Sequence, residues 1–104
     1  MLRRPKSLVW SPAVVGLIAL LGACGPTHFS IHSVSASRHV EQARHMGAET
    51  LAPYEFRMAV SHLDKAREEA GKAEYHDAVK LARIANEQAQ KAVVVARERK
   101  GSQR

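Results

Sequence analysis

Cysteine and aromatic residues are scarce in this chain of 104 residues. It has one cysteine, Cys24, so a fold held together by disulfides within one chain is excluded. It also has only one Trp, two Tyr and two Phe, which leaves few large side chains to bury. A chain of this length forms one domain at most. We therefore expect a single small domain with a thin core.

The N-terminus lacks acidic residues and combines a basic start with an uncharged apolar stretch. Residues 1–7, MLRRPKS, contain three cations, and residues 8–23, LVWSPAVVGLIALLGA, contain no charge. This order is typical of a secretory signal. As a membrane span the stretch is short, because Pro12 and Gly16 interrupt it and about 20 apolar residues are usually needed.

The apolar stretch ends in Leu21-Gly22-Ala23-Cys24, which resembles the lipobox of bacterial lipoproteins. The resemblance implies that residues 1–23 are a cleaved signal peptide and that Cys24 carries a diacylglyceryl group as a membrane anchor. Such acyl chains anchor stably, since each buried CH₂ contributes about 0.8 kcal/mol. In the lipoprotein sorting rule an Asp after the cysteine favours the inner membrane, so Gly25 implies the outer membrane, with the protein facing the periplasm. The alternative is a small buried cysteine beside a plain signal anchor.

The net charge of +6 first points to nucleic acid, but it is concentrated at the N-terminus. Cleavage after residue 23 removes three cations and leaves 13 Lys and Arg against 10 Asp and Glu, or +3 over 81 residues. The sequence also has no interleaving of aromatic and basic residues. We expect no nucleic-acid partner.

The mature sequence predicts an all-α fold. Residues 24–32, CGPTHFSIH, have few apolar anchors and predict a tether. A helical domain is expected over 33–100, with helices over roughly 33–49, 53–71 and 74–100, and 101–104 as a disordered tail. The second helix is expected to begin at Pro53 and to end with Gly71 as its C′ glycine.

The predicted helices share apolar faces made mostly of alanine. Alanine favours helix and lets two helices approach closely, and a short turn makes the second and third helices antiparallel neighbours. The predicted architecture is an antiparallel α-hairpin with a shorter third N-terminal helix and no pocket of about 300 Å³. The faces comprise Ala36, Val40, Ala43 and Gly47; Phe56, Ala59, Val60, Leu63, Ala66 and Ala70; and Tyr75, Ala78, Leu81, Ala82, Ala85, Ala89, Ala92, Val93 and Ala96.

Residues 48–92 resemble an alanine-rich family of small exported bacterial proteins known only as a domain of unknown function. Members occur as lone lipoproteins or ahead of an OmpA-like peptidoglycan-binding domain. No second domain of that kind is found in this sequence, so the resemblance does not imply a wall-binding role. Gly71 lies one residue further from the tyrosine than in many members. The matching features are Ala52-Pro53, Leu63 with Ala66, Gly71 with Tyr75 and Ala78, and Leu81-Ala82 with Ala85.

No residue pattern indicates catalysis or a metal site. His28 and His32 have helical i, i+4 spacing, but no carboxylate or cysteine stands at ligand spacing. Glu68 and Glu69 are adjacent and diverge on a helix, and Ser61-His62 lacks a third catalytic member. We expect no enzyme activity, no metal and no cofactor, and surface positions for the histidines. These are His28, His32, His39, His45, His62 and His76.

Three functions fit this sequence. The first is a lipid-anchored envelope protein with a helical interaction or scaffold role; the alternatives are a small periplasmic carrier or chaperone-like binder, and an inert spacer. Ile84 and Val95 are eleven residues apart and fall within about 20° of each other on a helix, away from the alanine face. They mark a candidate surface for an envelope protein or a second copy, unless the first helix covers them.

Overall fold

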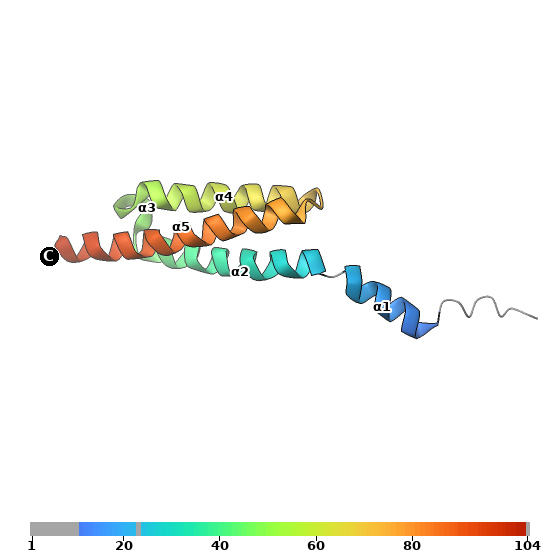
Figure 1. The fold of residues 1–104 in the computed structure, drawn as a ribbon. Helices are drawn as coiled ribbons and strands as arrows, with labels where there is room; N and C mark the ends of the chain where they lie inside the picture. Colours follow the sequence, from blue (N-terminus) through green and yellow to red (C-terminus); the bar gives the residue numbers. More distant parts are fainter. Residues whose placement is uncertain (1–10, 23, 104) are drawn as a thin grey trace, which may run out of the picture.

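The computed structural model describes residues 11–22 and 24–103, and every element within them is a helix (Figure 1). The all-α prediction is confirmed. The helices are α1 (Pro12–Gly22), α2 (Cys24–His45), α3 (Ala48–Leu51), α4 (Pro53–Gly71) and α5 (Tyr75–Ser102). Helix α1 leads away from the others and contacts only α2. None of these helices combines the length and hydropathy needed to cross a membrane.

Helices α2, α4 and α5 lie side by side and form the bundle. Figure 1 shows α5 against both neighbours, with α2 running in the same direction as α5 and α4 running in the opposite direction. The predicted antiparallel hairpin is therefore α4–α5. The N-terminal helix is not the shorter arm that we expected, because α2 has 22 residues and α4 has 19.

The predicted tether over residues 24–32 is wrong, because these residues form the first turns of α2. Pro26 is compatible with a helix there, since its missing N–H would have no partner in the first turn. The start of α2 also packs on the hairpin: a Cβ placed on Gly25 would lie 3.1 Å from Cδ2 of Tyr75. Tertiary packing thus extends the helix over a sequence with weak helical periodicity.

The bundle core consists almost entirely of alanine. Most of the predicted faces of the three long helices are buried, including Val40, Phe56, Leu63 and Val93. The exceptions are half-buried: Gly47, Val60, Ala70, Tyr75 and Leu81. Alanine buries little area per residue but lets the helix axes approach closely, so α5 can contact two helices at once. Two core residues, Ala48 and Ala52, were not predicted because they flank the chain reversal and follow no continuous helical stripe.

The connection between α2 and α4 differs from the prediction of a helix running to residue 49. Helix α2 ends at His45, Gly47 adopts a left-handed φ of 80°, and α3 forms a single turn before Pro53 begins α4. Glycine adopts this conformation without a steric penalty. The guanidinium of Arg99 on α5 donates a hydrogen bond to the carbonyl of Leu51 and ties this connection to the central helix.

The turn between α4 and α5 places an alanine, not the predicted Gly71, in the left-handed conformation. Gly71 is the last residue of α4, and Ala73 has a φ of 63°. The N–H of Glu74 donates to the carbonyl of Glu69, and the N–H of Ala73 donates to that of Ala70, both at 2.9 Å. These two bonds form a Schellman motif with Ala73 at C′.

The C-terminal tail predicted over residues 101–104 is also partly helical. Helix α5 continues through Gly101 to Ser102, and the Ser102 hydroxyl donates to the carbonyl of Glu98 at 3.0 Å. The N–H of Gln103 closes the helix by donating to the Arg99 carbonyl at 3.2 Å. Residue 104 lies outside the described residues.

Exchanging the turn residues tests which of them carries the left-handed conformation. Ala73→Gly should raise the free energy of unfolding by about 0.5–1 kcal/mol, because it relieves the steric cost of a left-handed alanine. Gly71→Ala should raise it by a similar amount, since this position is helical and an added Cβ meets nothing within 4 Å. Urea unfolding measures both. A loss of stability in Gly71→Ala would contradict this turn assignment.

Enlarging an alanine at the centre of α5 tests the close packing. Ala85 has no exposed surface, so Ala85→Leu should lower the free energy of unfolding by about 1–3 kcal/mol through overpacking. Lys80→Leu, at an exposed position of the same helix, serves as the control and should change stability little. Equal effects of the two substitutions in thermal unfolding would show that α5 is placed in the wrong rotation.

Candidate functional site

The lipobox residues span the junction of α1 and α2. Helix α1 ends at Gly22 and α2 begins at Cys24, whereas Ala23, like residues 1–10 of the predicted signal peptide, lies outside the described residues. Cleavage and lipidation therefore remain predictions. The structure places Cys24 at the end of the bundle where α2 starts, one residue from the contact with the hairpin.

Gly25 and Tyr75 hold the start of α2 against the start of α5. A Cβ on Gly25 would meet Cδ2 and Cγ of the Tyr75 ring at 3.1 and 3.3 Å, closer than ordinary van der Waals contacts. Packing against Tyr75 therefore restricts which residue can follow Cys24. A surface hollow of about 420 Å³ opens beside this contact, and its lining residues are Gly25, His28, Tyr75, His76, Val79 and Arg83.

A polar cluster joins α2 to α5 near the middle of α2. Nδ1 of His39 lies 2.7 Å from Oδ1 of Asn86 and 3.0 Å from the carbonyl oxygen of Ser35. Because the backbone carbonyl can only accept, Nδ1 is the protonated ring nitrogen and donates to it and to the Asn86 amide oxygen. The Ser35 hydroxyl donates to the same oxygen at 3.4 Å. The cluster fixes how α2 and α5 are aligned along their axes.

The paired carboxylates Glu68 and Glu69 bind lysines of the same region. Lys65 lies 3.1 Å from Glu68 and 3.0 Å from Glu69, and Lys72 lies 3.4 and 3.6 Å from them. Hydrogen bonds from Lys65 lower the pKa of both carboxyls, and Glu69 followed by Glu68 raises the pKa of Lys65. The two carboxylates therefore share the same two lysines in one ion-pair network, although adjacent helical residues were expected to diverge, and Glu69 is much less exposed than Glu68.

The candidate partner surface, Ile84 and Val95, faces the α4 side of α5. Ile84 is 38% exposed, whereas Val95 is half-buried and packs against the core. Both residues were expected to lie away from the alanine face, but Val95 packs against the core that this face forms. Each lines an open hollow between α4 and α5, so α4 rather than α2 flanks them. Partner binding at these residues remains a prediction.

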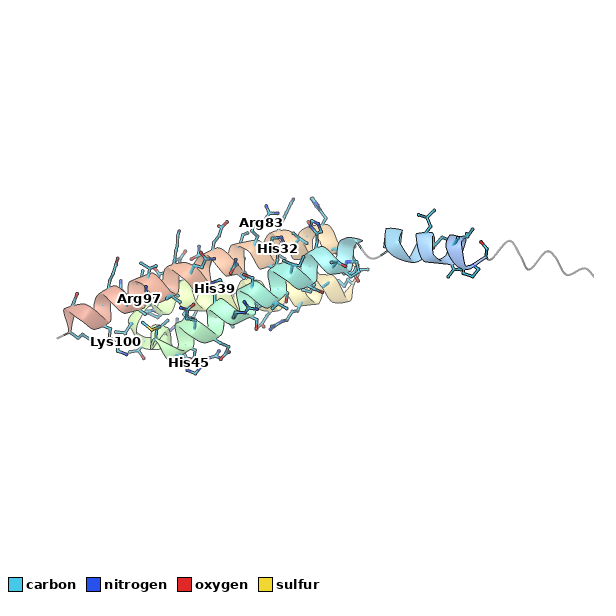
Figure 2. The ribbon with its side chains drawn as sticks, turned by 90° about the horizontal axis from the view of Figure 1, so that it is seen from below. His32, His39, His45, Arg83, Arg97 and Lys100 are labelled. Atoms are coloured by element: carbon cyan, nitrogen blue, oxygen red, sulfur yellow. The ribbon has the colours of Figure 1, made fainter. Side chains whose placement is uncertain are left out.

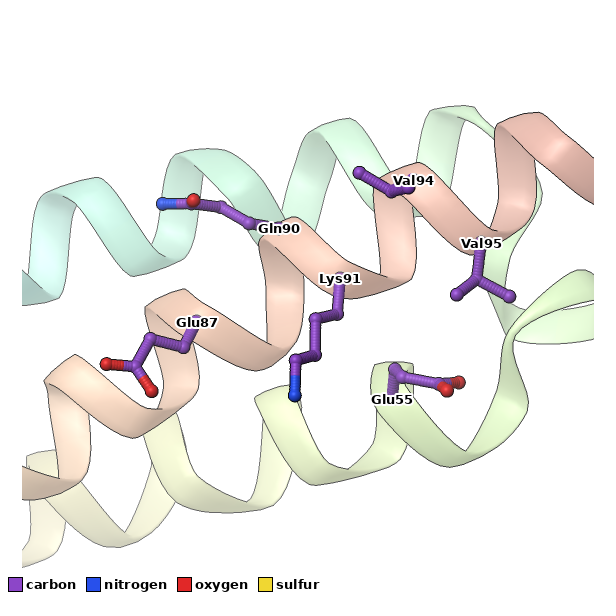
Figure 3. Close-up of a pocket in the computed structure, with 6 residues that line it drawn as sticks. All are labelled: Glu55, Glu87, Gln90, Lys91, Val94 and Val95. Atoms are coloured by element: carbon purple, nitrogen blue, oxygen red, sulfur yellow. The ribbon is translucent and has the colours of Figure 1, made fainter.

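The larger of these two hollows corrects the expectation that the bundle has no pocket of about 300 Å³. It measures about 500 Å³ and lies on the surface beside the alanine core (Figure 3). Figure 3 shows the Lys91 side chain extending towards α4, with Val95 near Glu55 at one end. The close approach of the axes fills the core but leaves a groove between the outer side chains. The lining residues are Glu55, Glu87, Gln90, Lys91, Val94 and Val95.

The histidines do not assemble a metal site in the part of the chain that the structure describes. No group of three or more His, Cys, Asp or Glu side chains there could hold a metal ion. His62 bonds to the carbonyl of Met58 at 2.8 Å, and the Ser61 hydroxyl donates to the same carbonyl at 3.4 Å. These two side chains serve local helix contacts.

Sequence reasoning missed the Ser35–His39–Asn86 cluster. His39 was assigned only to the surface, and Asn86 was not considered. Two signals were present in the sequence. Asn86 lies between Ala85 and Ala89 on a helix with an alanine face, and Ser35 and His39 are four residues apart on another helix. Pairing these residues required knowing that α2 runs alongside α5.

A double-mutant cycle measures the coupling between His39 and Asn86. Asn86→Ala should lower the free energy of unfolding by about 1 kcal/mol, because His39 loses an acceptor in a half-buried position. His39→Ala combined with Asn86→Ala should cost less than the sum of the single changes. Gln90→Ala, four residues further along α5 at an exposed position, is the control. If the losses in free energy of unfolding of the two single variants add up strictly in the double variant, as measured by urea unfolding, His39 and Asn86 are not coupled by a hydrogen bond.

Comparison with known proteins places the chain in a family. No curated protein and no solved structure matches it. One family model, described as "Domain of unknown function (DUF4398)", matches residues 34–104. This range covers the second half of α2 and all of α3, α4 and α5, and it includes the polar cluster and the hairpin. The resemblance to a domain of unknown function is thereby confirmed, and the chain belongs to the DUF4398 family.

Proposed function

We propose that the chain is a lipid-anchored lipoprotein of the bacterial cell envelope with a non-enzymatic interaction or scaffold role at the outer membrane. The observation that carries the proposal is the order of a basic start, an uncharged apolar stretch and Leu21-Gly22-Ala23-Cys24. Lipid on Cys24 would attach the protein to the membrane. The helical bundle would then present its surfaces to an envelope protein or to a second copy.

The fold is compatible with cleavage before Cys24. Helix α2 begins at that residue, and α1 contacts only α2. The buried core extends from Ala36 to Ala96 and includes none of residues 12–18, the part of α1 whose burial is described. Removal of residues 1–23 would therefore leave the packing of α2, α4 and α5 intact. This separation between an apolar leader and a self-contained bundle supports the proposal.

A carrier role is the second candidate, and the hollow in Figure 3 favours it over an inert spacer. Val94, 48% exposed, and the half-buried Val95 give this hollow an apolar wall between charged side chains. A small apolar ligand would bind there through burial of these valines. Saturable binding of an apolar fluorescent probe that Val94→Glu abolishes would favour the carrier over the scaffold.

Mass spectrometry of the membrane fraction tests the anchor. We expect a mature species that begins at Cys24 and carries a diacylglyceryl group, with residues 1–23 removed. Cys24→Ser should abolish the lipid and leave the chain uncleaved by the lipoprotein peptidase or released in soluble form. An unmodified Cys24 thiol on a chain that still carries residues 1–23 would contradict the proposal.

A further inference from the structure

The surface hollows divide the bundle by charge. On the sides that involve α4, each hollow is lined by two acidic residues as well as by cations, as with Glu55, Glu87 and Lys91. Two hollows on the α2 side have no carboxylate among their lining residues, and they contain Arg38 and Arg83 instead. These two hollows therefore present cations without a carboxylate beside them, although Glu41 and Glu87 follow Arg38 and Arg83 by one helical turn.

These cations belong to one strip along α2 and α5. Asn86 contacts α2. Steps of three and four residues along α5 from Asn86 reach Arg83 in one direction and Arg97 and Lys100 in the other, so these residues lie on the same side of the helix. On α2, Arg38 follows Ser35, which contacts Asn86, by three residues. We define Arg38, Arg83, Arg97 and Lys100 as the α2–α5 strip. All four are exposed and make no ion pair within the described part of the chain.

Figure 2 shows this side of the bundle, where Arg83, His32, His39 and Arg97 follow one another along the two helices. Hydrogen bonds and a shared hollow place Gly25, His28, Ser35 and His39 of α2 beside Tyr75, His76, Val79, Arg83 and Asn86 of α5, and none of these residues is acidic. The distance along α5 from Arg83 to Lys100 is about 25 Å at 1.5 Å per residue. An anionic partner of this strip must therefore be extended or flat.

Exposed apolar side chains lie next to the strip close to Cys24. Ile31 and Val34 are 63% and 56% exposed, and both line a hollow of about 470 Å³ with Arg38. Exposed aliphatic side chains beside cations are the composition of helices that lie in a membrane interface. Ile31 follows Cys24 by seven residues, so the apolar pair lies about two helical turns from the proposed anchor.

We propose that the α2–α5 strip docks on an anionic phospholipid surface, with Ile31 and Val34 entering the interface. The proposal deepens the proposed function and rests on it for the membrane location, since a lipid on Cys24 would hold this face within reach of a bilayer. Each cation near an anionic bilayer strengthens binding about fivefold, and the contribution disappears beyond a Debye length. The strip would lay the bundle flat on the membrane.

Vesicle co-sedimentation of the full, unlipidated chain tests this docking separately from lipidation. The probes are vesicles of phosphatidylcholine alone and of phosphatidylcholine with phosphatidylglycerol in equal parts. The strip variant is Arg38→Gln, Arg83→Gln and Arg97→Gln. The control variant, Arg57→Gln, Lys80→Gln and Lys91→Gln, removes the same charge from exposed positions elsewhere on α4 and α5. Apolar residues 12–22 contribute equally to all variants.

We expect the strip variant to bind the anionic vesicles about ten to a hundredfold more weakly, and the control variant to stay within about twofold of the parent. A strip variant with Lys at all three positions should regain binding, which also shows that the fold survives. Equal losses in both variants, or equal binding of the parent to both vesicles, would overturn the proposal. Binding of an acidic protein to the α2–α5 strip in the absence of vesicles would also overturn the proposal. None of these results depends on whether Cys24 carries lipid.

Discussion

Close packing of alanine against alanine is the contact on which this fold depends. Ala78, Ala82, Ala85, Ala89, Ala92 and Ala96 form one face of α5, and all are fully buried. Their small size brings α2 and α4 close to α5, so that a chain with few large side chains can bury a continuous core. Within the described residues no charged side chain is buried. The distribution of charge over the faces therefore decides what the bundle can contact.

The alanine periodicity predicted the hairpin because helical spacing alone determines which side of a helix is apolar. It predicted the start of α4 at Pro53 and nearly all of the buried faces. It did not predict the start of α2, because the contact of Gly25 with Tyr75 joins residues 50 positions apart. It also placed the turn conformation at Gly71, whereas the hydrogen bonds of Ala73 and Glu74 place it at Ala73.

The same distinction applies to the candidate sites. The lipobox pattern is local, so Cys24 could be selected from the sequence, and it lies at the first position of α2. The Ser35–His39–Asn86 cluster and the α2–α5 strip depend on which two helices are neighbours, and periodicity within one helix contains no such information. Ile84 and Val95 share a side of α5 as predicted, but only Val95 packs against the core, which helical periodicity does not reveal.

The contact between Gly25 and Tyr75 limits how far the bundle could reach from its anchor. A lipoprotein with a long flexible leader can search a large volume, whereas here the packed bundle begins one residue after Cys24. Helix α5, with 28 residues, is about 42 Å long. A lipid on Cys24 would therefore restrict every contact to a shell of roughly that thickness above the bilayer. Within this shell the effective concentration of surface-bound partners would be high.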